Sequence, residues 1–141
     1  MIKINRNTSN EVILTLTEKV TISAPYYFLF SFTSQSTNST KNFLCADTSS
    51  YTDRYNSFTI TEVNAGSENL NTGSVNLQPE GFWNYKIYAQ TSSSNLVPAS
   101  ANELVEEGIV RVMGSDVQTY NEYDGQTTTL KYYNPEEWVI L

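Results

Sequence analysis

The carboxylates of one loop are the side chains best placed to do chemistry. The segment CADTSSYTDRYN, residues 45–56, contains Asp47 and Asp53, and two carboxylates can serve as the acid and base of glycoside hydrolysis. With Ser49 and Asn56, the same loop also offers oxygen ligands to a calcium ion. Its spacing does not match the loop of an EF-hand, however, and Asx- and Ser/Thr-turns explain this composition without an ion. We therefore expect a cluster of turns here rather than a catalytic or metal site.

Histidine is absent from the chain, and cysteine occurs once, as Cys45. Without histidine, Ser-His-Asp and Cys-His catalysis are excluded, together with nearly all catalytic zinc sites. A single cysteine excludes an intrachain disulfide and, without histidine, a structural zinc site. The glycine-rich loops that bind nucleotide phosphates are also missing. These absences predict a protein that is not an enzyme and has no cofactor.

The charge and the hydrophobic pattern limit the classes of partner. The formal net charge is −7, and an acidic chain repels phosphate backbones, so we expect no nucleic-acid partner. The longest apolar stretch, APYYFLF, is too short to cross a bilayer. The first residues, MIKINRNTSN, lack the apolar region of a signal peptide. We therefore expect no membrane association. We also expect the chain to be cytosolic when it is made.

Alternating hydrophobicity between turn signals predicts about seven strands in the first 115 residues. This spacing is typical of an antiparallel, Ig-like β-sandwich, so the predicted fold class is all-β. Tyr85 follows the turn at residues 79–81 and is expected to hydrogen-bond backward across it. Residues 100–108 fit either a short helix or a loop leading into a strand. The predicted strands are residues 11–19, 25–34, 41–47, 54–63, 74–78, 81–90 and 108–114.

The segment GFWNYKIYAQ, residues 81–90, presents two different faces as a strand. One face is apolar and is predicted to be core, as is the Tyr26, Phe28, Phe30 and Phe32 face of residues 25–34. The other face mixes Phe82 and Tyr88 with Asn84 and Lys86. That mixture predicts a contact surface, because tyrosine offers a rigid apolar ring and a polar handle. The core face carries Trp83, Tyr85, Ile87 and Ala89.

Residues 116–141 differ from the domain predicted for residues 1–115. Asp124-Gly125 indicates a hairpin turn between two tyrosine-rich flanks, and the chain ends in EEWVIL. This C-terminal ribbon or tail either closes the same sandwich or docks on another subunit. We expect its aromatic and apolar residues to form a partner interface with Phe82 and Tyr88. The predicted interface residues of the tail are Tyr120, Tyr123, Tyr132, Tyr133, Trp138, Val139, Ile140 and Leu141.

Three ordered motifs carry a family resemblance over roughly residues 10–115. They are NEVILTLTEKVTISAPYYFLFSFTSQSTN, FLCADTSSYTDRYNSFTITE and GFWNYKIYAQTSSSNLVPA, the last continued by LVEEGIVRVMG. Together they resemble small virion proteins of tailed bacteriophages, in particular those of crAss-like and related phages of gut Bacteroidetes. The resemblance implies a non-enzymatic structural subunit of the virion, associated with the head as a decoration protein or head-fibre base. A tail or collar adaptor is a close variant.

The same resemblance implies partners and a location, but no catalytic residues. The implied partners are capsid, fibre or collar subunits, together with further copies of this chain, and the implied location is the virion. A carbohydrate-binding module for host surface glycans is the alternative. In that module Tyr27, Tyr88 or Trp138 would stack on sugar rings, and the sequence does not separate sugar contact from protein contact.

Overall fold

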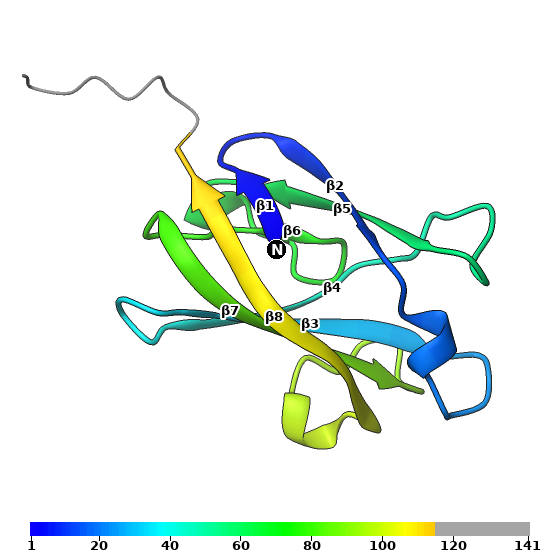
Figure 1. Ribbon diagram of the computed structural model, residues 1–141. Helices are drawn as coiled ribbons and strands as arrows, with labels where there is room; N and C mark the ends of the chain where they lie inside the picture. The colour runs from blue at the N-terminus through cyan, green and yellow to red at the C-terminus, as the bar shows by residue number, and fades with distance from the viewer. Residues whose placement is uncertain (115–141) are drawn as a thin grey trace, which may run out of the picture.

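The computed structural model describes residues 1–114, which form two sheets joined by tight turns and longer loops (Figure 1). Three single-turn 3₁₀ helices, η1 (Thr17–Lys19), η2 (Ala65–Ser67) and η3 (Pro98–Ser100), lie in the connections. The predicted C-terminal ribbon, with its turn at Asp124-Gly125, lies outside the described residues. The strands are β1 (Ile2–Asn5), β2 (Ser9–Leu14), β3 (Tyr27–Ser34), β4 (Thr40–Leu44), β5 (Asn56–Glu62), β6 (Ser74–Val75), β7 (Gly81–Gln90) and β8 (Glu103–Met113).

The predicted all-β sandwich is confirmed, although its sheets are mixed rather than purely antiparallel. The larger sheet has the strand order β1-β8-β7-β3-β4 and the smaller sheet the order β2-β5-β6. β1 runs parallel to β8, with Ile2 opposite Val110, and β5 runs parallel to β6. The other pairings are antiparallel. Long connections allow these parallel pairs, because strands far apart in sequence can join in either direction.

β1 is a strand that the hydrophobic pattern did not predict. Ile2 and Ile4 alternate with polar residues and are buried against the core, 6% and 0% exposed. Figure 1 shows β1, at the start of the chain, beside the C-terminal end of β8. β8 itself begins at Glu103, so of the two alternatives for residues 100–108 the lead into a strand is correct: residues 101–102 connect η3 to β8, and Gly108 lies inside that strand. The predicted strand of residues 11–19 ends early, at Leu14.

The core between the sheets is built largely from aromatic rings. Phe30 of β3 packs edge-on against Phe58 of β5, with ring centroids 5.0 Å apart, and stacks on Phe43 of β4 at 5.4 Å. Phe58 therefore ties the smaller sheet to the larger one. The predicted core face of β7 is confirmed, because Trp83, Tyr85, Ile87 and Ala89 are all buried.

The turn before β7 is held by Trp83, not by the tyrosine expected to do so. The indole Nε1 of Trp83 donates a hydrogen bond of 2.9 Å to the carbonyl of Pro79. Tyr85 lies farther along the strand, and its hydroxyl donates instead to Glu106 of β8. The prediction for Tyr85 was therefore wrong: its ring extends across β8 above Gly108 and cannot reach back to the turn.

Candidate functional site

The described residues carry two surfaces that could bind a partner, and the first is the outward side of β7 and β8. Residues opposite one another in an antiparallel pair share a face, so the register assigns the side chains of both strands. We call this set the β7–β8 outer face. It comprises Phe82, Asn84, Lys86 and Tyr88 of β7 with Leu104, Glu107, Ile109 and Arg111 of β8.

A β-bulge shapes this outer face. The register between β7 and β8 shifts between Ile87 and Tyr88, so Tyr88 lies opposite Leu104 while Ile87 lies opposite Glu106. Val105 is the extra residue and packs partly against the core. Because of the bulge, Leu104 faces outward beside Tyr88, and Glu106 faces the core side of the sheet.

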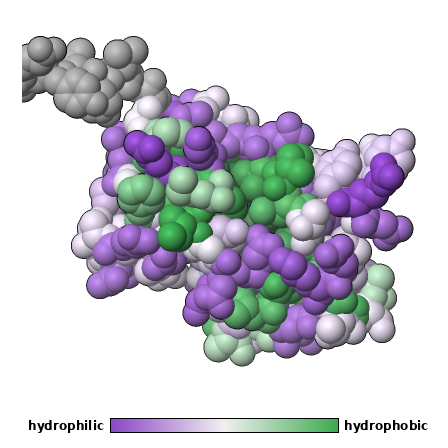
Figure 2. All heavy atoms as spheres, in the orientation of Figure 1, coloured by the Kyte–Doolittle hydropathy of each residue, from purple (hydrophilic) through white to green (hydrophobic). Residues whose placement is uncertain are grey.

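The outer face has apolar ends and a polar middle. Phe82, Leu104 and Ile109 are 49%, 45% and 43% exposed. Lys86 lies opposite Glu107 between them, and Arg111 lies over the Phe82 ring at 5.9 Å. Figure 2 shows separate groups of hydrophobic atoms on this side of the molecule, with hydrophilic atoms between them. Large apolar side chains exposed together on one sheet are a feature of contact surfaces.

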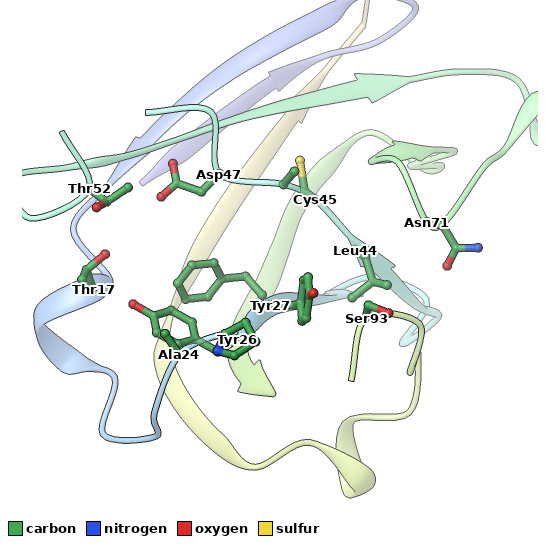
Figure 3. Close-up of a pocket in the computed structure, with 13 residues that line it drawn as sticks. Thr17, Ala24, Tyr26, Tyr27, Leu44, Cys45, Asp47, Thr52, Asn71 and Ser93 are labelled. Carbon is green, nitrogen blue, oxygen red and sulfur yellow. The ribbon is translucent and has the colours of Figure 1, made fainter. Parts of the chain in front are cut away.

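The second surface is a groove beside the start of β3 and the end of β4, with a volume of about 580 Å³. Tyr26 and Tyr27 form one side, and the chain that follows β4 forms the other. Figure 3 shows Asp47 and Cys45 across from the two tyrosines, with Thr17 and Ser93 toward the ends. We call this the Tyr26–Tyr27 groove. Its size is within the usual range for pockets that hold small ligands.

The turn cluster that the sequence predicted forms the wall around Asp47. Oδ1 of Asp47 accepts hydrogen bonds from the backbone N–H groups of Ser49 and Ser57, at 2.9 and 3.0 Å. Oδ2 accepts a bond of 2.6 Å from the side-chain amide of Asn56. The bond to Ser49 defines an Asx-turn, which is the structural role expected for this loop.

Asn56 connects that loop to the chain that follows β2. Its Oδ1 accepts hydrogen bonds from the backbone N–H groups of Leu16 and Thr17, at 2.7 and 3.2 Å. Its Nδ2 donates to Oγ1 of Thr17 as well as to Asp47. Asn56 is 0% exposed, so one buried amide fixes two walls of the groove relative to each other.

Cys45 closes the inner wall of the groove as an unreactive thiol. Its Sγ donates a hydrogen bond to the carbonyl of Thr59 at 3.1 Å, and burial raises the pKa of the thiol to about 11. Gly73 lies against it, where an added Cβ would be 3.0 Å from the sulfur. The thiolate is therefore scarce at neutral pH, and Cys45 acts as a small apolar residue.

The structure places two of the predicted interface residues, Phe82 and Tyr88, together on the β7–β8 outer face. Tyr27, predicted to stack on sugar rings in the alternative carbohydrate-binding module, lies in the groove. The sequence reading placed Tyr26 in the core; its ring packs on Phe28 and also lines the groove. Ser93 also lines the groove, and the sequence indicates this only through the polar composition of its loop. Outside the described residues lie Tyr120, Tyr123, Tyr132, Tyr133, Trp138, Val139, Ile140 and Leu141.

Within residues 1–114, no group of three or more His, Cys, Asp or Glu side chains is placed to hold a metal ion. In the loop that carries the two carboxylates, Asp53 is exposed, whereas both carboxylate oxygens of Asp47 accept hydrogen bonds from the protein. None of the helices in that part of the chain is long and apolar enough to span a membrane.

Comparison with known proteins leaves the chain without a family. No family model matches it, and neither does any curated protein. Among solved structures, a protein of Bacteroides vulgatus ATCC 8482 assigned as a glycoside hydrolase matches with a TM-score of 0.43 and 11% identity over 82% of this chain. The chain spans 17% of the length of that structure. A match at this level assigns neither a fold nor an activity.

Proposed function

We propose that this chain is a non-enzymatic structural subunit that binds other protein subunits through the β7–β8 outer face. The observation that carries the proposal is the exposure of Phe82, Leu104 and Ile109 together on one rigid sheet face. A sheet face presents its side chains in a fixed array, so a partner can bind without ordering a loop first.

The composition of this face favours a protein partner. Aromatic residues and arginine are enriched in protein interfaces, and Arg111 lies over the ring of Phe82 at the edge of the set. Lys86 and Glu107, opposite each other in the middle, place both signs of charge side by side. A mixed pair of this kind suits a polar, self-complementary contact more than a strongly charged ligand.

The particle we propose is the virion of a tailed phage, in which this chain is associated with the head. The support is the resemblance of residues 10–115 to small virion proteins, together with a rigid β-sandwich that exposes an apolar and aromatic sheet face. A rigid sandwich of this kind would serve as a decoration protein, a head-fibre base or a collar adaptor.

Mass spectrometry of purified particles of the encoding phage tests the assembly. We expect this chain at a copy number comparable to other structural proteins. Lysine acylation of intact particles then tests the surface: Lys86 should be protected relative to the free protein, while Lys19, on η1, should react equally in both. Absence of the chain from the particles would contradict the virion role, and equal labelling of Lys86 would contradict the assigned face.

Outer-face variants provide a second test. Phe82→Ser and Ile109→Ser should fold normally, because both side chains are exposed, but should fail to incorporate into particles. Tyr51→Ser, which changes a residue that is 65% exposed elsewhere on the surface, is the matched control and should incorporate like the wild type. Normal incorporation of Phe82→Ser and Ile109→Ser would refute docking through this face.

A further inference from the structure

We infer that the Tyr26–Tyr27 groove is a binding site for a neutral saccharide, separate from the β7–β8 outer face. The groove combines aromatic rings on one side with hydroxyl, amide and carboxylate groups on the other. Sugars present an apolar C–H face and a rim of hydroxyl groups, so this combination matches both of their surfaces. The inference goes beyond the proposed docking role and does not depend on it.

The aromatic side of the groove is held rigid before any ligand arrives. Tyr26 packs edge-on against Phe28 with centroids 5.6 Å apart, and Phe28 packs in the same way against Phe58. Tyr27 begins β3 and lies opposite Gln90 of β7. Its ring is 42% exposed although its backbone belongs to the sheet. A pre-ordered ring loses little conformational entropy when it stacks on a ligand.

The loop that carries Ser93 is fixed as well. The side-chain amide of Gln90 is buried and donates to the carbonyls of Ser92 and Asn95, at 3.1 and 2.9 Å. Asn95 in turn donates to Oε1 of Gln90 at 2.8 Å. This exchange of hydrogen bonds holds residues 92–95 against the end of β7, so the hydroxyl of Ser93 keeps its place beside the groove.

The polar side retains unused hydrogen-bonding capacity. Asp47 receives three N–H donors, whereas an ionised carboxylate can accept about four. Oγ1 of Thr17 accepts from Asn56, so its hydroxyl hydrogen is available to donate. Within the described residues, the hydroxyl groups of Tyr26 and Tyr27 make no hydrogen bond. A ligand with several hydroxyl groups would supply both the missing donors and the missing acceptors.

The charge of the groove selects a neutral ligand. No lysine or arginine is among the described residues that line it, and Asp47 is the one carboxylate among them. Phosphorylated, sulfated or uronic-acid ligands would meet a carboxylate with no cation to compensate it. The volume of about 580 Å³ accommodates a short segment of a sugar chain. The structure thus favours a neutral glycan over an anionic one.

Native affinity electrophoresis of the full chain tests this inference. The gels would contain a neutral β-glucan, galactomannan or arabinoxylan, with polygalacturonate as the anionic probe. We expect retardation in at least one neutral gel and none in polygalacturonate. Tyr27→Ala should weaken binding about tenfold, equivalent to about 1.4 kcal/mol. Ser93→Trp, which replaces a groove hydroxyl with a bulky ring that fills the space, should also weaken binding.

Controls separate this site from the proposed docking face. Tyr51→Ala removes an exposed tyrosine that does not line the groove, and Phe82→Ser alters the outer face. Both should bind the polysaccharide like the wild type, and thermal unfolding should show all variants folded. The inference is overturned by retardation in no neutral gel, by retardation only in polygalacturonate, or by unchanged binding of both groove variants. Failure of Phe82→Ser to enter particles would leave this site unaffected.

Discussion

The hydroxyl of Tyr85 donates a 2.7 Å hydrogen bond to Oε2 of Glu106, across the pair of strands that forms the centre of the larger sheet. Lys19 of η1 lies 2.7 Å from Oε1 of the same carboxylate. Burial, and next the neighbouring carboxylate, raise the pKa of Tyr85, so its hydroxyl stays protonated and remains a donor. The ring reaches Glu106 only because Gly108 has no side chain beneath it.

Gly108→Ala tests that close approach. An added Cβ would lie 2.7 Å from the Tyr85 ring, so the ring or the strand must shift, and we expect a loss of about 1–3 kcal/mol in the free energy of unfolding. Gly66→Ala is the matched control, because its added Cβ meets nothing within 4 Å, and should change stability by less than about 0.5 kcal/mol. Urea denaturation measures both. Equal stabilities would mean that the ring is not held where it lies.

Asn56→Ala should be among the most destabilising polar substitutions in the domain. It removes the partner of the buried N–H of Leu16 and the donor to Oδ2 of Asp47, and we expect a loss of about 3 kcal/mol. Asn71→Ala, at an exposed asparagine, is the control and should be nearly neutral. Chemical denaturation compares the two variants. A near-neutral Asn56→Ala would show that other groups hold the groove walls.

Truncation of two adjacent residues of β7 should lower the free energy of unfolding by very different amounts. Trp83 is 0% exposed and donates to Pro79, so Trp83→Ala should cost about 3–5 kcal/mol. Phe82 points outward, and Phe82→Ala should cost less than about 1 kcal/mol, mainly through lost contact with Arg111. Thermal unfolding of the two variants is the measurement. Similar losses would contradict the assignment of the two faces.

Glu103 makes the stability of the domain depend on pH. The hydroxyl of Thr21, followed by its backbone N–H, donates to the carboxylate and lowers the pKa of Glu103 below its ordinary value of 4.5. A lowered folded-state pKa stabilises the fold above that ordinary value, and the stabilisation is lost as the pH falls through the lowered pKa. Glu103→Gln should therefore be less stable than the wild type at neutral pH.

That difference between wild type and Glu103→Gln should shrink at pH values below 4.5. Urea unfolding over a pH series measures it. Glu107→Gln is the control, because the Glu107 side chain makes no hydrogen bond within residues 1–114. A pH-independent difference between wild type and Glu103→Gln would refute the role of the ionised carboxylate.

The strands that alternate strongly in hydrophobicity were predictable from the sequence, and β1 was not. The face assignment of β7 follows from period-two alternation alone, because Trp83, Tyr85 and Ile87 are large and their neighbours Asn84 and Lys86 are polar. β1 has the same alternation, but only Ile2 and Ile4 carry it, which is too short a pattern to distinguish from an irregular terminus. Its parallel pairing with β8 is a long-range choice that local sequence does not encode.

The candidate sites were only partly predictable, for a related reason. Phe82 and Tyr88 could be placed on an outward face because they belong to a regular strand. The groove is formed by three loops that meet at the start of β3. The sequence composition does not indicate that Asp47, Thr17 and Ser93 lie near one another. The bulge that turns Leu104 outward is likewise invisible in the sequence, since Val105 fits a strand as well as its neighbours do.

The pairing of β1 with β8 also bears on the order in which the domain assembles. β1 leaves the ribosome long before β8, which is its strand partner within residues 1–114 and is completed at Met113. Until then Ile2 and Ile4 have no sheet to join, and the core is open along one edge. Pairings of such large sequence separation slow folding, because the intervening chain must first be closed into a loop. The sandwich of the described domain can therefore close only after β8 has emerged, and a nascent chain held short of β8 should remain protease-sensitive at β1.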